Sequence, residues 1–183
     1  MKTSSGVATT LLVLFGWVVA AGTAAAQEKS GNTYVGAVAC GKCHKTEKSG
    51  NQLTVWQQSK HAKAYETLTT AAADSIAKAK GLTTKAADSE SCLGCHTTGG
   101  PSSGVSRSEG VGCEACHNAG SGYKGMSTMR EKAAAITAGM RDFTDPAATE
   151  TFCRSCHNEK SPTAKEFVFA ERWAKIKHER PAE

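Results

Sequence analysis

Apolar residues are concentrated near the start of the chain and recur at helical spacing further along. Met1-Lys2 gives a positive start, residues 8–20 form an apolar run, and Ala24-Ala25-Ala26 is a small-residue cleavage pattern. The run is shorter than the roughly 20 residues that a membrane span requires. We therefore predict a signal peptide over residues 1–26, with an uncleaved N-terminal anchor as the alternative. Residues 27–183 have the length of a single domain.

Two helices are predicted in the first half of that domain. Residues 51–68 contain helix formers without Gly or Pro, and Trp56, Tyr65 and Leu68 share broad faces with His61 at helical spacing. A second helix is predicted over residues 71–80, because the following Gly81 is a favourable helix end.

The middle of the domain combines a loop with a third helix. Residues 97–112 hold five glycines, one proline and four serines, which predicts a loop. Thr128 and Glu131 form a predicted capping box, so a helix is expected to start there and to stop at Gly139.

Helix signals continue to the C-terminus. Asp145-Pro146 is an N-cap and first-turn pair, and it predicts a helix that carries Cys153 and His157. After the interruption at Pro162, a final helix is predicted over residues 163–178. No alternating pattern of useful length indicates a strand. The predicted fold class is mainly α and loop-rich.

The pentapeptide Cys-x-x-Cys-His occurs four times and uses all eight cysteines. This spacing is the attachment signature of c-type haem, because two thiols three positions apart form thioethers with the vinyl groups and the next His reaches the iron. We therefore predict four covalently bound c-type haems. The attachment cysteines are Cys40 and Cys43, Cys92 and Cys95, Cys113 and Cys116, and Cys153 and Cys156, and the proximal ligands are His44, His96, His117 and His157.

Zinc sites and disulfides are the alternatives for paired cysteines. Neither alternative predicts a His directly after all four pairs. Four haems also leave few residues around each porphyrin, so the macrocycles are expected to supply much of the apolar core. The expected structure is a small multihaem cytochrome c fold that depends on its cofactors, with the apo chain largely unfolded.

The net positive charge of the polypeptide is offset once the predicted haems are counted. The polypeptide has a formal net charge of +5, but each haem brings two propionates. The propionates offset this excess, so the basic character is not a nucleic-acid signal. Lysines such as Lys45, Lys60 and Lys63 are expected to screen propionates or to form a solvated face, and a docking patch for an acidic redox partner is an alternative that the sequence does not separate.

Few residues remain for the second axial positions. Two of the six histidines, His61 and His178, are not proximal ligands, and we predict both as distal ligands; the alternative is an ordinary structural histidine. Met is the other usual axial partner, and Met126 or Met129 is predicted to cap a further haem. Core filling is the alternative for these methionines.

The chain resembles the tetrahaem cytochrome c-554 family over most of residues 27–183. The first haem motif with the segment from Trp56 to Ala64 resembles the family's opening site and its helix with a distal His. Residues 110–117 resemble the third site, and residues 152–157 with a His near the end of a C-terminal helix resemble the fourth.

The resemblance implies specific ligands. It implies that His61 caps the haem of His117, that His178 caps the haem of His157, and that the haem of His96 has no distal protein ligand. Where the family places a His after its third site, this chain has residues 125–129. Met126 or Met129 then replaces that ligand on the haem of His44, or two haems are open.

These features predict an exported, soluble electron carrier between a periplasmic donor and another cytochrome or terminal reductase. The alternatives are a haem enzyme acting on nitric oxide, nitrite or hydroxylamine at the haem of His96, and a subunit of a larger redox complex. In the enzyme hypothesis Arg107 and Glu109 line the distal pocket, although a solvated loop is the simpler interpretation. Glu114 and Arg154 are expected to be exposed linker residues inside or beside their motifs.

Overall fold

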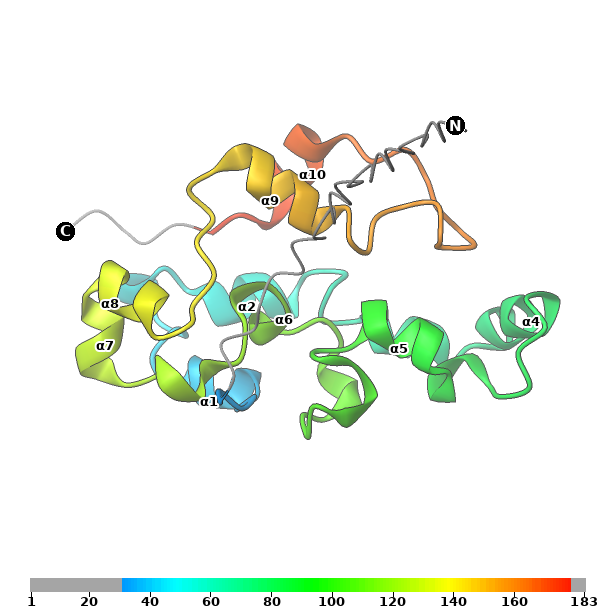
Figure 1. The fold of residues 1–183 in the computed structure, drawn as a ribbon, viewed down its shortest axis with the longest axis horizontal. Coiled ribbons are helices and arrows are strands. Elements are labelled where there is room, and N and C mark those ends of the chain that lie inside the picture. Colours follow the sequence, from blue (N-terminus) through cyan, green and yellow to red (C-terminus); the bar gives the residue numbers. More distant parts are fainter. Residues whose placement is uncertain (1–30, 179–183) are drawn as a thin grey trace, which may run out of the picture.

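The computed structural model describes residues 31–178 as short helices joined by turns and loops, with no strand in that range (Figure 1). This agrees with the mainly helical, loop-rich class expected from the sequence. The predicted signal peptide, residues 1–26, lies outside the described residues. The α-helices are α1 (Ala37–Gly41), α2 (Gln52–Gln57), α3 (Ala64–Leu68), α4 (Ala71–Ala79), α5 (Glu90–His96), α6 (Cys113–His117), α7 (Met126–Arg130), α8 (Lys132–Thr137), α9 (Pro146–Cys153) and α10 (Phe169–Ile176), and the 3₁₀ helices are η1 (Glu47–Ser49), η2 (Ala86–Asp88), η3 (Gly100–Ser102), η4 (Arg107–Glu109) and η5 (Gly120–Gly122).

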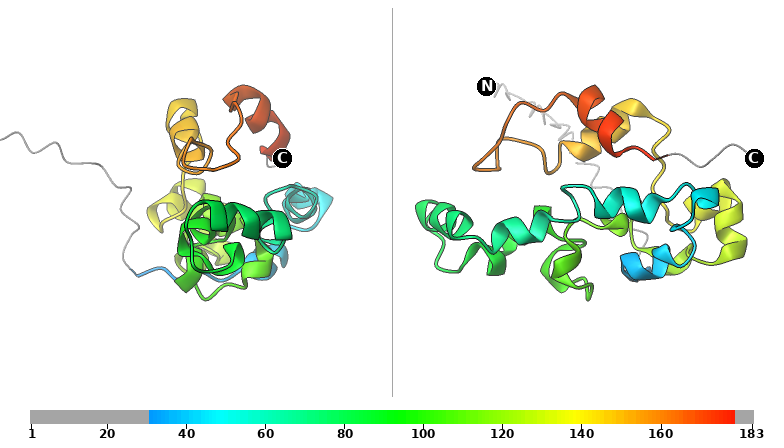
Figure 2. Two further views of the ribbon diagram at one scale, coloured as in Figure 1. Left: turned by 90° about the vertical axis from the view of Figure 1, so that its right-hand side faces the viewer. Right: turned by 180° about the vertical axis from the view of Figure 1, so that it is seen from behind.

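The helices are arranged in two layers (Figures 1 and 2). A long lower row runs from α7 and α8 at one end, through α1, α2 and α6, to α5 and α4 at the other, and α9 and α10 lie above this row. The ring of Phe143 joins the layers, because its centroid lies 5.4 Å from that of His117, 5.8 Å from Phe152 in α9 and 5.9 Å from Trp173 in α10.

A conventional hydrophobic core occurs at the α4 end of the row. Leu68, Ala77, Ala86 and Leu93 are buried together there, and we call this group the polypeptide core. Leu93 is fully buried at 0% exposure, although it stands inside the second haem motif. Burial of these side chains therefore fixes the position of Cys92 and Cys95 on α5 without help from a cofactor.

Two of the predicted helices are confirmed closely. Helix α4 covers residues 71–79, and Gly81 follows with a φ of 76°. Helix α9 starts at Pro146, and the Asp145 carboxylate accepts a hydrogen bond of 2.9 Å from the Ala147 N–H. Cys153 is the last residue of α9, so His157 lies in the turn that follows rather than on the helix as predicted.

The prediction of one helix over residues 51–68 is wrong in its middle. The chain forms α2 and α3 with a turn between them, and His61 lies in that turn. The His61 carbonyl accepts a hydrogen bond of 2.9 Å from the N–H of Val111, a residue far along the chain. A Cβ on Gly110 would come within 2.6 Å of the same carbonyl, so only glycine allows this approach. The contact between His61 and residues 110–111 therefore interrupts the helix that was predicted over residues 51–68.

The predicted capping box and final helix also need correction. Thr128 lies within α7 and Glu131 lies between α7 and α8, so the helix that ends before Gly139 begins at Lys132. The last helix begins at Phe169 rather than near residue 163. The preceding segment is held by the fourth motif, because the Arg154 guanidinium donates a hydrogen bond of 3.2 Å to the Phe167 carbonyl.

Within residues 31–178, no helix combines the length and the apolar character that a membrane crossing requires.

Candidate haem-binding site

The four pentapeptides occupy four different places in the fold. The first lies on α1 and the turn after it, the second on α5, the third on α6, and the fourth at the end of α9 and in the following turn. In each motif the first Cys lies on a helix, and the second Cys lies on the same helix or in the turn after it. Both thiols therefore stay close to the His of the motif. All eight cysteines are free thiols in the structure.

Thiols of different motifs lie next to each other. The Cys40 thiol of the first motif lies close to the Cys113 thiol of the third, and the Cys95 thiol of the second lies close to the Cys156 thiol of the fourth. The neighbouring Cys113, together with burial, raises the pKa of Cys40. Burial, with a smaller effect of Cys156, raises the pKa of Cys95 to about 11. The chain therefore gathers its motifs as a first-with-third pair and a second-with-fourth pair.

Four of the six imidazoles also form two pairs. The ring centroids of His61 and His157 are 5.9 Å apart, and those of His117 and His178 are also 5.9 Å apart. Imidazole nitrogen binds a transition metal at roughly 2 Å, so two imidazoles that share one iron have centroids about 6 Å apart. Both pairs therefore have the separation that a shared iron requires.

This pairing differs from the one that the resemblance implies. The resemblance assigns His61 to the haem of His117 and His178 to the haem of His157, and the structure places each with the other partner. The turn that contains His61 is held against Val111, just before the third motif, while its ring faces the fourth motif in the upper layer. The direction of the chain in this turn decides which motif the His61 ring contacts. The spacing of residues in the sequence does not reveal that direction.

Hydrogen bonds orient three of the imidazoles as metal ligands. The Nδ1 atom of His96 lies 2.8 Å from the Ala64 carbonyl, that of His178 lies 3.2 Å from the Ile176 carbonyl, and that of His44 lies 3.3 Å from Gln52 Oε1. A metal-ligating His commonly donates its second ring N–H to such an oxygen, which fixes the tautomer and leaves Nε2 for the metal. These residues fit a haem iron.

His117 has the most buried imidazole environment among the motifs. Burial, and then the nearby His178, His44 and Arg141, lower its pKa to about 4. Its Nδ1 atom is buried and has no hydrogen-bond partner among the described residues. Burial also lowers the pKa of His61, with a smaller effect of His157. Neutral imidazole is the form that binds a metal, so both environments suit axial ligands.

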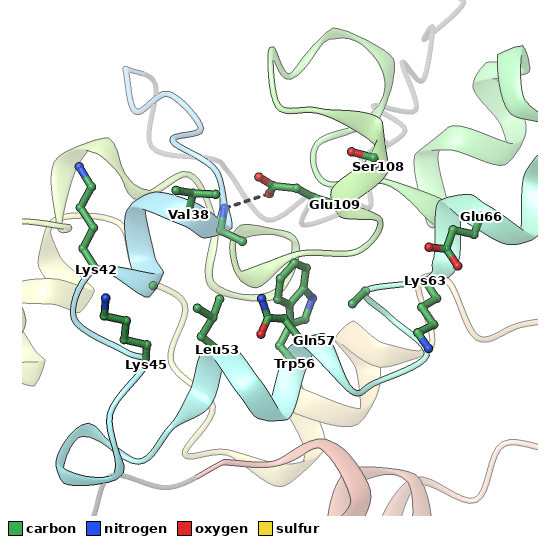
Figure 3. Close-up of a pocket in the computed structure, with 13 residues that line it drawn as sticks. Val38, Lys42, Lys45, Leu53, Trp56, Gln57, Lys63, Glu66, Ser108 and Glu109 are labelled. Carbon is green, nitrogen blue, oxygen red and sulfur yellow. Dashed lines mark hydrogen bonds between the residues drawn. The ribbon is translucent and has the colours of Figure 1, made fainter.

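A cleft of about 550 Å³ adjoins the first motif (Figure 3). Its apolar surface comes from Leu53 and Trp56, and Lys42, Lys45 and Lys63 stand along it. Apolar walls suit a porphyrin face and ammonium groups suit its propionates. The lining of the cleft, which includes Gly41 and Lys42 of the first motif, therefore fits a haem there, and attachment at Cys40 and Cys43 stays a prediction.

The two candidate methionines differ in exposure. Met126 is 65% exposed, and its sulfur accepts a contact of 3.6 Å from the Arg130 guanidinium on the same helix. Met129 is half-buried. Both methionines stand on α7, and Met126 or Met129 stays the predicted ligand.

Glu114 was expected to be an exposed linker residue, and this expectation is wrong. It is 2% exposed, and its carboxylate accepts hydrogen bonds from the N–H groups of Val35, Gly36 and Gly120. A backbone turn that folds over a motif brings these donors together, and the sequence signals only that a charged residue stands between two attachment cysteines. Arg154 is partly exposed as expected, and it pairs with Glu150.

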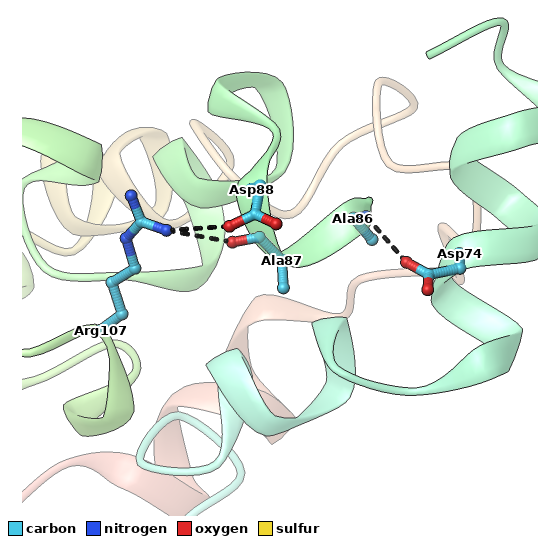
Figure 4. Close-up of polar contacts among 5 residues, drawn as sticks. All are labelled: Asp74, Ala86, Ala87, Asp88 and Arg107. Atoms are coloured by element: carbon cyan, nitrogen blue, oxygen red, sulfur yellow. Dashed lines mark hydrogen bonds and ion pairs between the residues drawn. The ribbon is translucent and has the colours of Figure 1, made fainter. Parts of the chain in front are cut away.

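Arg107 and Glu109 have separate roles and do not meet in one pocket. The Arg107 guanidinium lies 3.4 Å from both the Ala87 carbonyl and an Asp88 carboxylate oxygen, and so holds η4 against η2 (Figure 4). Glu109 accepts a hydrogen bond of 2.9 Å from the Ala37 N–H and lines the cleft at the first motif. Neither contact is directed at the second motif, where the enzyme hypothesis placed these residues.

Two polar residues without any sequence signal tie neighbouring motifs together. The buried Thr98 hydroxyl accepts a hydrogen bond of 2.8 Å from the Gly112 N–H and so links the second motif to the third. The Arg141 guanidinium donates to the Cys116 carbonyl at 2.9 Å and lies 4.2 Å from the centroid of Phe152, which links the third motif to α9. Both act through backbone carbonyls or amides, which no residue pattern reveals.

Comparison with models of protein families supports a cytochrome. Residues 39–118 match a family described as cytochrome c554 and c-prime, a range that contains the first three haem motifs. No curated protein and no solved structure matches the chain. The resemblance noted from the sequence is thus supported by an independent comparison, and the fourth pentapeptide and His178 lie outside the matched segment.

Proposed function

We propose that this chain is an exported tetrahaem c-type cytochrome that carries electrons, because residues 39–118 match the family described as cytochrome c554 and c-prime. It accepts electrons from a periplasmic donor and passes them to another cytochrome or a terminal reductase. When bound, c-type haem supplies an iron that takes up and releases one electron. The chain holds and orients the haems and adjusts their potentials.

The contacts between thiols of different motifs are the observation that carries this proposal. Cys40 meets Cys113 and Cys95 meets Cys156, so haems attached there would stand next to each other in two pairs. The Cys116 thiol is near Cys153 and Cys156 as well, which brings the two pairs together. Close spacing of all four cofactors is what an electron carrier needs.

Each distal ligand has a defined task in this proposal. His61 shares an iron with His157 and His178 shares one with His117, as the ring separations indicate. Met126 or Met129 is the candidate for the haem of His44. Ligand type and burial together would give the haems different potentials, because a Met ligand raises the potential relative to two His ligands.

Mass spectrometry and a redox titration of the purified holoprotein test the proposal. We expect a mass equal to the polypeptide without residues 1–26 plus four haems, recovery from the periplasmic fraction, and reversible titration of all four irons. Zinc in place of haem, or a holoprotein with fewer than four haems, would contradict it. The same sample on a size-exclusion column separates a discrete carrier from a subunit of a larger complex.

Two triple variants test the ligand assignment. His61→Ala should create a high-spin ferric signal in electron paramagnetic resonance spectra. Adding Cys153→Ser and Cys156→Ser, which removes the fourth haem, should abolish that signal if His61 caps the haem of His157. The control adds Cys113→Ser and Cys116→Ser instead, and there the signal should persist. The opposite pattern would restore the assignment that the family resemblance implies.

A second candidate function is catalysis at the haem of His96. The observation in its favour is that His61 and His178 both lie beside other proximal histidines, which leaves the second motif without either of them. A small nitrogen compound such as nitric oxide, nitrite or hydroxylamine would then have access to that iron. Binding of carbon monoxide or nitric oxide by the reduced holoprotein would favour this candidate, and its absence would leave electron transfer alone.

A further inference from the structure

The carboxylate of Glu114 lies at the junction of the first and third haem motifs. It projects from α6, between Cys113 and Cys116. One oxygen accepts hydrogen bonds from Val35 N–H at 2.9 Å and Gly120 N–H at 2.6 Å, and the other accepts from Val35 N–H at 2.9 Å and Gly36 N–H at 2.7 Å. Every one of these partners is an N–H group, which can only donate. The site therefore fits an ionised carboxylate.

The backbone around Glu114 has the shape that this contact requires. Gly36 has a φ of 81°, a conformation that suits glycine, and it stands immediately before α1. A Cβ on Gly120 would lie 2.9 Å from a Glu114 oxygen. The next N–H along the chain, that of Ala37, donates to Glu109. Consecutive N–H groups ahead of the first haem helix are thus directed at two carboxylates, an arrangement that binds anionic groups well.

The buried charge is close to both attachment sites. Cys40 at the end of α1 lies close to Cys113 at the start of α6, so the first and third haems would be attached beside each other. Glu114 is the neighbour of Cys113 in sequence, and its partner Gly36 stands at the start of α1, the helix that carries Cys40. Water screens a carboxylate poorly when only 2% of the residue is exposed.

We propose that Glu114 is a positioning residue that also sets the potentials of the first and third haems. Its hydrogen bonds hold the segment before α1 against α6, and its fixed negative charge favours the ferric state over the ferrous state. A ferric haem carries one more positive charge than a ferrous haem, so a nearby anion lowers the midpoint potential. This inference rests on the proposed haem attachment.

Redox titration of the holoprotein carrying Glu114→Gln tests the inference. Gln keeps the size of the side chain and one oxygen acceptor but removes the charge. We expect four haems per chain, as in the wild type, and a higher midpoint potential for one or two of them. Asp74→Asn is the matched control, because it removes the same charge from a carboxylate that also accepts a backbone N–H, that of Ala86 at 3.0 Å, but stands on α4 at the far end of the lower row (Figure 1). That variant should titrate like the wild type.

The outcomes separate this inference from the proposed function. A wild-type protein without haem at motifs one and three would overturn the proposed function itself. Four haems in Glu114→Gln with potentials unchanged, or changed no more than in Asp74→Asn, would overturn the inference alone. If Glu114→Gln does not assemble, Glu114→Asp decides, because it keeps the charge. Four haems at wild-type potentials in Glu114→Asp would support the inference, and failure to assemble or shifted potentials would overturn it.

Discussion

One end of the lower helical row and the region around α1, α6 and α9 are stabilised in different ways. At the α4 end, α3, α4, η2 and α5 bury apolar side chains against each other in the polypeptide core. Around α1, α6 and α9 the chain instead gathers thiols and imidazoles, which we call the haem cluster, and it joins them through polar groups such as Glu114 and Arg141. The first region resembles an ordinary small domain, whereas in the second the proposed haems would supply the apolar material of the core.

The difference explains why the second motif is unlike the others. Leu93 belongs to the polypeptide core and Cys92 packs against it, so the second attachment site is positioned by side-chain burial. The other three motifs are positioned by hydrogen bonds and by contacts between rings and thiols. The haem of His96 would therefore have a rigid protein support, and the other haems would help to build their own surroundings.

Withholding haem should have the largest effect and should fall mainly on the haem cluster. We expect amides of α1, α6, α9 and α10 to exchange at rates of an unfolded chain in the apoprotein, because their buried apolar surface is missing. Residues 64–96 should keep the most residual protection. Hydrogen exchange with mass spectrometry of apo and holo forms measures this. Equal loss of protection in both regions would show that the polypeptide core depends on haem as much as the haem cluster does.

Truncation of Leu93 should have the next largest effect, and it tests the polypeptide core. Leu93→Ala leaves a cavity at a fully buried site and should lower the free energy of unfolding by about 2–5 kcal/mol. Val55→Ala is the control, because Val55 on α2 is 39% exposed and does not line the cleft at the first motif, so it should change stability by less than about 0.5 kcal/mol. Denaturant titration of the holoproteins gives both values, and similar values would contradict a core centred on Leu93.

Substitution of Gly110 should sharpen the comparison at the haem cluster. Gly110 and Gly104 have φ values of 62° and 77°, so Ala at either position should cost about 1–2 kcal/mol. Only Gly110→Ala also meets backbone, at 2.6 Å from the His61 carbonyl, whereas Gly104→Ala meets open space. We expect Gly110→Ala to be the less stable variant and to add a high-spin ferric signal as His61 moves. If neither Gly110→Ala nor Gly104→Ala adds a high-spin signal, the contact between Gly110 and the His61 carbonyl does not hold His61 as a ligand.

The smallest effects are expected at η2, which contacts Asp74 on one side and Arg107 on the other (Figure 4). Asp74→Ala removes the acceptor of the Ala86 N–H at 3.0 Å and should cost about 1 kcal/mol, which Asp74→Asn should largely restore. Arg107→Ala breaks a partly exposed ion pair of 3.4 Å and should cost less than about 1 kcal/mol. Thermal unfolding of the three variants ranks them, and a larger effect of Arg107→Ala would show that η4 supports the polypeptide core.

Helices with local signals were predictable from the sequence. Asp145-Pro146 and Gly81 mark helix ends through side-chain capping and a left-handed backbone, and both act within one turn of the chain. The helix predicted across His61 failed because a hydrogen bond from Val111 competes with helix continuation. The final helix began later than predicted because residues before it are held by Arg154. Each failure arises from a partner distant in sequence.

The spacing of cysteine and histidine within each pentapeptide determined the attachment chemistry, because thioether formation and iron ligation need only neighbouring residues. The tertiary structure alone decided which motifs meet, which imidazole faces which, and that Glu114 is buried. These outcomes depend on the direction in which loops return the chain, as at Gly110 and Gly36. Short-range residue patterns do not encode that direction, because it results from contacts between segments that only the folded chain brings together.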